Sequence, residues 1–430
     1  MRAEVELSRI EGIAELLERW ALLLIPVALV TLSGVADALC TFVAVSFFAR
    51  VVLRRDVSWL AQPWLAVLLL IWLYLMGRSL VSVEPSRSLL DALIWVRYPV
   101  FAVAVSRILP DPLWRDRLIM VSTGAVLFLA CDAIVQYLVG FDIVGRPIQP
   151  DGRLTGTFKS PRVGICIAWM FLPPLMGLLD QRRWWLAAVL GISSVLAIML
   201  SGERMALLTV GLDVIFLAVL FPVWRRRILV AAVAAVAIFV LIVALQPALL
   251  DRQVFSIWRT ASGLGESHYG IIWSRALAIA AEHPIFGVGM HNYRVVCPDL
   301  AFGPVEQPDG YARCSTHPHN YYIEWLLAGG IPVLVAFIAA TILLVRQLLK
   351  SGQPRDGLFF GLVATLMMRL WYLASNTSFF LGWSAIPLFL YVGWALAYTP
   401  TRAQGRARVT TASDGRLSDE TLPRRAEPAR

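Results

Sequence analysis

The histidines of this chain are gathered in one stretch. All five lie between residues 268 and 319 of a 430-residue chain, where even scattering would place fewer than one: His268, His283, His291, His317 and His319. His319 falls where a long apolar segment begins, and the positive end of a helix dipole at that place lowers the pKa of an imidazole. A neutral imidazole can accept a proton from a hydroxyl group. Two other interpretations stay open: His319 and Asn320 cap the helix, or His317 and His319 bind zinc as a pair.

Arginines within or directly beside apolar segments form a second set of candidates. They are Arg97, Arg153, Arg162, Arg204 and Arg369. An unpaired arginine is costly near hydrocarbon, and a guanidinium group binds phosphate with two parallel hydrogen bonds. Together these arginines predict an anionic ligand. For each one singly, the alternative is an ion pair with a carboxylate or a side chain that reaches to the membrane surface.

Other patterns narrow the chemistry. The chain contains no Asp-x-Asp sequence, which disfavours a metal-bound nucleotide-sugar donor and favours a lipid-linked donor. Gly287-Val288-Gly289 is a weak match to a nucleotide-binding loop, because no strand precedes it. The cysteines show no zinc-like spacing. Cys297 and Cys314 can form a disulfide in an oxidising compartment or remain two thiols.

The scaffold that positions these residues is predicted to be embedded in a membrane. Hydrophobic residues make up 58% of the chain and charged residues 16%, with a mean hydropathy of +0.70. In soluble domains about 45–50% of the residues are apolar and roughly 25% are charged, so this composition excludes an ordinary water-soluble enzyme. The apolar residues form blocks long enough to cross a hydrocarbon core of about 30 Å. We expect an all-α, polytopic protein with about 12 transmembrane helices, at residues 20–34, 36–53, 62–77, 89–106, 118–139, 163–179, 184–200, 205–222, 228–246, 320–345, 357–375 and 381–399.

The arginine-rich connections predict the orientation and the segments outside the spans. With residues 1–19 in the cytoplasm, most of these connections fall on the cytoplasmic side. Both termini are then cytoplasmic, with residues 1–19 as an amphipathic helix in the membrane interface and residues 400–430 as a disordered tail. Helices 1–9 occupy residues 20–246 and helices 10–12 occupy 320–399. Between them, residues 247–319 form a long periplasmic loop with short helices. The net charge of +9 belongs to a membrane protein and does not indicate nucleic-acid binding.

The pair His319-Asn320, followed by Gly330, resembles a motif of the bacterial O-antigen ligase and polymerase family. Three further segments resemble that family in the same order: Arg153-Leu154-Thr155-Gly156-Thr157-Phe158, Ser201-Gly202-Glu203-Arg204, and Pro284-Ile285-Phe286-Gly287-Val288-Gly289 with Tyr293. The similarity covers roughly residues 20–399. It implies that His319 is the base acting on an acceptor hydroxyl. It also implies that arginines hold the pyrophosphate of an undecaprenyl-linked glycan.

Two positions depart from the family pattern. Members commonly carry an arginine just before the tryptophan that precedes the Pro-x-x-Gly-x-Gly segment. Here Tyr269 and Gly270 precede Trp273, and Arg275 follows it. The acidic residue often found two positions before the glycine is Ala328. Which residue replaces the family arginine is left open by the sequence.

We therefore predict a glycosyltransferase of the bacterial inner membrane, surrounded by membrane lipids. It transfers a glycan from undecaprenyl pyrophosphate to an acceptor hydroxyl, on lipid A-core or a similar glycan, with inversion and with no metal or cofactor. The site residues are His319 as catalytic base, Arg204, Arg153, Arg97 and Arg275 as pyrophosphate ligands, and Asn320, His317 and Gly330 as supporting residues. The alternatives are a repeat-unit polymerase with the same chemistry and a twelve-helix transporter, although the sequence shows no internal repeat of the kind that transporters carry.

Overall fold

The computed structural model describes residues 2–247, 250–251, 255–302, 314–350, 356–372 and 377–398, and in these residues helices are the only regular elements. The predicted all-α class is confirmed. The expected tail, residues 400–430, lies outside the described residues. The helices are α1 (Arg2–Thr31), α2 (Ser33–Leu53), α3 (Pro63–Ser79), α4 (Pro85–Trp95), α5 (Arg97–Ile108), α6 (Pro112–Val139), α7 (Val163–Met170), α8 (Leu172–Asp180), α9 (Trp184–Leu200), α10 (Arg204–Leu220), α11 (Arg225–Leu245), α13 (Ser256–Ser262), α14 (His268–Glu282), α15 (Tyr293–Val296), α16 (Tyr321–Lys350), α17 (Gly357–Arg369) and α18 (Gly382–Leu396).

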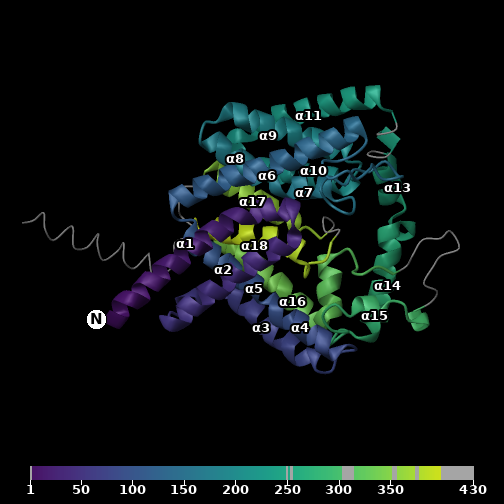
Figure 1. Ribbon diagram of the computed structural model, residues 1–430. Coiled ribbons are helices and arrows are strands. Elements are labelled where there is room, and N and C mark those ends of the chain that lie inside the picture. Colours follow the sequence, from purple (N-terminus) through teal and green to yellow (C-terminus); the bar gives the residue numbers. More distant parts are fainter. Residues whose placement is uncertain are drawn as a thin grey trace, which may run out of the picture.

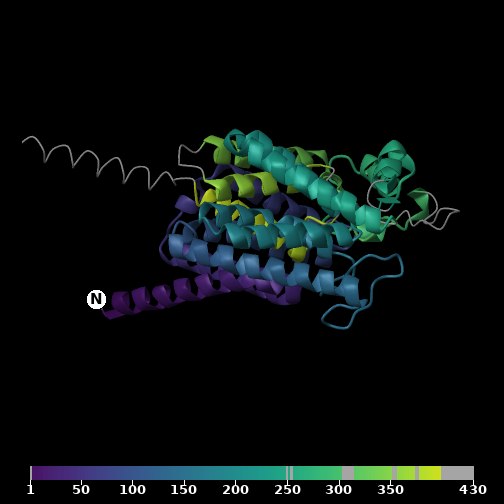
Figure 2. The same ribbon diagram turned by 90° about the horizontal axis from the view of Figure 1, so that it is seen from above.

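The long helices run side by side as a bundle, and the short helices α13, α14 and α15 gather at one end of it (Figure 1). The N-terminal end of α1 projects past the opposite end of the bundle in both views (Figure 2). Residues close in sequence to α13 and α14 are therefore placed at the end of the bundle away from the N-terminus.

Within the described residues, every apolar segment expected from the sequence falls on one helix or on two helices in series. Residues 89–106 cover α4 and α5, and residues 163–179 cover α7 and α8. The break before α8 precedes Pro173 and Pro174, whose missing N–H groups are tolerated only in the first turn of a helix. By length and composition, 6 helical stretches can cross a membrane among the described residues, and four further apolar helices are shorter. The number of crossings and the side on which each connection lies stay predictions.

The N-terminal helix differs from the separate interfacial helix expected over residues 1–19. Residues 2–31 form one continuous helix, α1. Its acidic face pairs with α2: Arg50 contacts Glu18 at 2.5 Å and Glu15 at 2.6 Å, and Arg54 contacts Glu11 at 2.6 Å. In the first part of the same helix, the apolar residues Ile10 and Leu17 are exposed. The acidic residues of the amphipathic pattern therefore form ion pairs with α2, and α1 continues past residue 19 without a break.

The tenth expected span, residues 320–345, is not one straight helix. Gly330 has non-helical backbone angles (φ 77°, ψ −173°) inside α16. The Tyr322 and Phe337 ring centroids are 5.7 Å apart, although fifteen residues of straight α-helix would separate them by about 22 Å. The chain therefore bends sharply at Gly330. Residues 321–329 form a short half-helix that begins two residues after His319, and residues 331–350 form the long part.

Candidate active site

A cavity of about 650 Å³ lies at the end of the bundle where α13 and α14 gather. It brings together residues from four parts of the chain that are remote in sequence. The lining residues are Asp151, Arg153, Pro161, Gly202, Glu203, Arg204, Met205, Asp251, Ser256, Thr260, Ser267, His268, Tyr269 and His319. Three of the predicted site residues, Arg153, Arg204 and His319, thus share one cavity.

The segment carrying Arg153 is fixed by a buried glutamine of α6. The Gln136 side-chain oxygen accepts hydrogen bonds from the backbone N–H groups of Thr155 and Gly156, at 3.0 and 2.9 Å. The N–H of Leu154 donates to the carbonyl of Ser201 at 3.1 Å. Arg153 itself is exposed, and its Nε donates to Asp151 at 2.6 Å. The backbone is rigidly held, while the guanidinium faces the cavity beside a carboxylate.

Arg204 is the first residue of α10 and is tied to the loop between α11 and α16. Its Nη1 donates to the Thr260 hydroxyl at 3.1 Å and to the Ser256 carbonyl at 3.4 Å. Both partners belong to α13. The preceding Glu203 faces inward and accepts a hydrogen bond of 2.7 Å from the N–H of Gly164, at the start of α7. The Ser-Gly-Glu-Arg motif therefore joins α7, α10 and α13 around the cavity.

His319 lies in the segment that leads into the half-helix. Its backbone has φ 52°, a left-handed conformation that is uncommon for a non-glycine residue. Its Nε2 is 3.1 Å from the Ser315 hydroxyl, and its ring centroid is 4.2 Å from that of His317. Asn320 is the residue that caps the helix, because its side-chain oxygen accepts from the N–H groups of Tyr322 and Ile323. Of the two residues expected to share the cap, only Asn320 serves it, and the His319 ring is directed to the cavity.

Gly330 is required by close contact between two motifs. A Cβ atom at this position would lie 2.2 Å from the Ile285 carbonyl oxygen. The N–H of Ile331 donates to Pro284 at 2.8 Å, and the N–H of Val288 donates to Leu327 at 2.7 Å. The Pro-x-x-Gly-x-Gly segment thus holds the bend of α16 in place. It supports the half-helix and lies outside the cavity.

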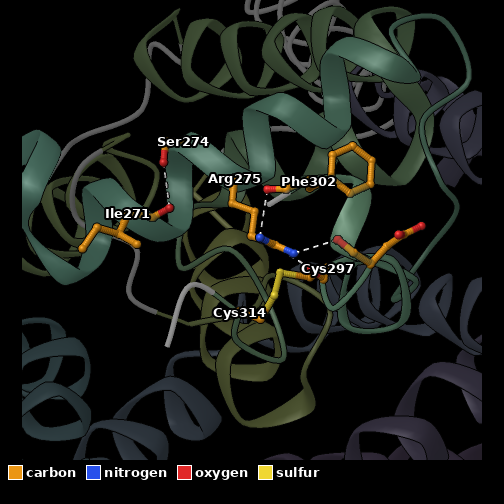
Figure 3. The surroundings of a disulfide bond; sticks show 7 residues. Ile271, Ser274, Arg275, Cys297, Phe302 and Cys314 are labelled. Atoms are coloured by element: carbon orange, nitrogen blue, oxygen red, sulfur yellow. Dashed lines mark hydrogen bonds between the residues drawn. A yellow bond between two sulfur atoms is a disulfide. The ribbon is translucent and has the colours of Figure 1, made fainter. Parts of the chain in front are cut away.

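Arg97 and Arg275, both predicted as pyrophosphate ligands, lie away from the cavity. The Arg97 guanidinium donates to Asp37 of α2 at 2.8 Å and covers the ring of Tyr98. Arg275 is buried, and its guanidinium donates to the backbone carbonyls of Cys297, Asp299 and Phe302, as Figure 3 shows for the region of the disulfide. Arg97 thus has the carboxylate partner that was the alternative for an arginine of the apolar segments, whereas Arg275 binds backbone carbonyls.

Cys297 and Cys314 form a disulfide, with their Cα atoms 5.7 Å apart (Figure 3). Arg275 clamps the chain just after Cys297, and Cys314 precedes His319 by five residues. The disulfide therefore ties the segment leading to His319 to the body of the loop. Of the two states that the sequence left open for these thiols, the bridged one is found.

Two further arginines are stabilised by aromatic rings. Arg369 is buried, lies over the Trp169 ring at 4.1 Å and donates to the Ser384 carbonyl at 2.7 Å. Trp169 stacks on Trp383, with ring centroids 5.3 Å apart. The Arg162 guanidinium lies over the Trp383 ring, 4.6 Å from its centroid. This alternation of cations and rings explains how two arginines of apolar segments are accommodated by the protein itself.

The electrostatics of the cavity are set by burial and by Arg204. Burial raises the pKa of the Glu203 carboxyl to about 7, against opposing effects of the Gly164 and Ile165 N–H groups and of Arg153. Burial and the Arg204 charge lower the pKa of His268. Burial likewise raises the pKa of the Tyr269 hydroxyl. Arg153 and Arg204 line the cavity together with the carboxylates of Asp151 and Asp251. The two guanidinium groups are the lining groups that can bind an anionic ligand.

The sequence did not single out His268, Tyr269 or Thr260 for this site. His268 belongs to the cluster of five histidines, which was the available signal, but nothing in its spacing related it to His319. Among the described residues, no group of three His, Cys, Asp or Glu side chains is arranged to hold a metal ion. The zinc interpretation of His317 and His319 therefore finds no third ligand in the described part of the chain.

Residues 165–338 match the O-antigen ligase family. The resemblance seen in the motifs is confirmed over this segment, which contains Arg204 and His319, whereas Arg153 precedes it. No curated protein matches the chain. The O-antigen ligase match and the apolar helices together support a multi-pass membrane protein with a glycosyltransferase-like function.

Proposed function

We propose that this protein is an O-antigen ligase-type glycosyltransferase that moves a glycan from undecaprenyl pyrophosphate to an acceptor hydroxyl at the periplasmic face of the inner membrane. One observation carries the proposal. Arg153, Arg204 and His319 come from three remote segments and line one cavity. A base for a hydroxyl and cations for a pyrophosphate are the two requirements of this transfer.

In the proposed reaction, the acceptor oxygen attacks the anomeric carbon of the donor sugar and inverts it. The bond between that carbon and the pyrophosphate oxygen breaks, and its electron pair leaves with the pyrophosphate. His319 takes the proton of the attacking hydroxyl. Arg204 and Arg153 stabilise the charge of the leaving pyrophosphate, so the reaction needs no acid on the leaving group. Positioned base catalysis contributes about 10²–10⁴-fold.

The position of the cavity argues against the transporter alternative. Transporters bind substrate near the middle of the bilayer, at discontinuous helices. Here Arg204 begins α10, Arg153 lies in the connection between α6 and α7, and His319 lies just before α16. All three line the cavity at one end of the bundle. A repeat-unit polymerase remains the second candidate, because it uses the same donor and the same chemistry.

Deletion of the gene, followed by gel analysis of the surface polysaccharide, tests the proposal. Loss of attachment with long chains retained identifies a ligase, and single repeats identify a polymerase. Unchanged polysaccharide in the deletion strain would overturn both.

A further inference from the structure

A second imidazole faces His319 in the same cavity. The ring centroids of His268 and His319 are 6.4 Å apart, and the ring of Tyr269 meets that of His319 edge-on at 5.8 Å. His268 is the first residue of α14, and its side chain is exposed to the cavity. The two histidines belong to separate elements and are brought together only by the fold.

The backbone at His268 is fixed on both sides. Ser267 caps α14 by accepting a hydrogen bond of 3.1 Å from the N–H of Gly270. A Cβ atom at Gly270 would lie 1.8 Å from the Leu264 carbonyl oxygen, so α14 packs closely on the turn before it. His268 therefore projects into the cavity from a rigid helix start.

Burial lowers the pKa of His268, and the charge of Arg204 lowers it further. The positive end of α14 acts in the same direction. Near neutral pH the imidazole then carries no charge and presents one N–H donor. His268 therefore lies near Arg204, a proposed phosphate ligand, and its ring is also 6.4 Å from that of the proposed base, His319.

We propose that His268 is a second catalytic residue, which donates a hydrogen bond from its ring N–H to the leaving pyrophosphate. The proposal rests on the proposed function. No proton passes from His268 in this step: the electron pair of the broken bond stays on the pyrophosphate oxygen, and the hydroxyl proton goes to His319. His268 thereby supplies a phosphate contact from α14, the helix on which Arg275 is turned away to backbone carbonyls.

Binding of the product, undecaprenyl pyrophosphate, to the purified full-length protein in detergent tests this role. A hydrogen bond to a charged group corresponds to about a 10- to 100-fold change in affinity. We expect His268→Ala to weaken binding by that factor. His268→Gln, whose amide keeps an N–H donor, should restore most of it. His283→Ala, at the other end of α14 and outside the cavity, is the matched control and should bind like the wild type.

Inorganic pyrophosphate serves as a second probe, because it separates the phosphate contact from any contact to the lipid. We expect the affinities of the His268 variants for inorganic pyrophosphate to stand in the same ratio as their affinities for undecaprenyl pyrophosphate. Thermal unfolding of each variant is measured in parallel, so that a folding defect is not read as a lost contact.

The outcomes separate this inference from the function on which it rests. Wild-type affinity in His268→Ala, or a His268→Gln variant as weak as His268→Ala, would overturn the hydrogen-bond role while leaving the proposed function standing. Failure of the wild type to bind undecaprenyl pyrophosphate would overturn both.

Discussion

Glu203 holds the start of α7 through a 2.7 Å hydrogen bond from the N–H of Gly164, which lies 39 residues earlier in the chain. The carboxyl group that makes this contact is buried, and burial raises its pKa to about 7 from an ordinary 4.5. The cap of α7 and the position of Arg204, the next residue, therefore depend on a group that titrates near physiological pH.

The raised pKa of Glu203 predicts a dependence of stability on pH. Its contribution is fully present below pH 4.5 and is lost as the pH rises toward 7, because the unfolded chain ionises first. Integrated over that range, the loss is about 3 kcal/mol. Glu203→Gln cannot ionise, so its melting temperature relative to the wild type should rise between pH 5 and pH 8. The exposed Glu282→Gln is the control, and an equal response of both variants would contradict the prediction.

Replacement of His319 by Ala should abolish transfer, a loss of about 10²–10⁴-fold, because no other group would take the hydroxyl proton. The apolar body of α16 should keep the variant folded in the membrane. His317→Ala should be milder, since His317 does not line the cavity. Restoration of surface polysaccharide in a deletion strain measures both effects. Near-normal transfer by His319→Ala would show that the base is another residue.

Transfer activity should survive EDTA. The proposed cations for the pyrophosphate are Arg153 and Arg204, and arginines need no divalent ion to bind phosphate. The assay uses membranes washed with EDTA, with and without added zinc or magnesium. Activity that disappears on chelation and returns with the metal would instead favour a zinc site at His317 and His319.

The Cys297–Cys314 disulfide should stabilise the fold by about 3 kcal/mol, since it closes a loop of 17 residues. The double variant Cys297→Ser/Cys314→Ser should therefore unfold at a lower temperature, whereas Cys131→Ser, which removes a free cysteine, should not. Labelling of both loop thiols by a membrane-impermeant maleimide without prior reduction would be incompatible with the bridge.

Gly330→Ala should destabilise the protein by about 1–3 kcal/mol or prevent its folding. The new methyl group would meet the Ile285 carbonyl, and the positive φ of this residue disfavours any side chain. Gly211→Ala, on α10 with open space around it, is the matched control and should be neutral or mildly stabilising. The measurement is the thermal unfolding of the two variants. A Gly330→Ala variant as stable as Gly211→Ala would contradict the prediction, because it would mean that the bend accommodates a methyl group at no cost in free energy.

The sequence by itself determined the helical class, the positions of the apolar segments and the candidates Arg153, Arg204 and His319. The helical class follows from composition, the apolar segments follow from the lengths of the apolar blocks, and the candidate residues follow from short motifs and their order along the chain. The sequence could not separate arginines that face a cavity from arginines that serve the fold. Arg97 and Arg275 looked equivalent to Arg204 until the Asp37 carboxylate and the three loop carbonyls were placed beside them.

Tertiary structure alone decided the bend at Gly330, the continuity of α1 and the meeting of His268 with His319. A bend depends on the Ile285 carbonyl from a segment 45 residues away, and the acidic face of α1 depends on arginines of α2. The His268–His319 pair depends on how α14 and the half-helix of α16 pack. Such contacts are set by which surfaces meet across the whole bundle, and neither hydrophobic periodicity nor motif spacing records that information.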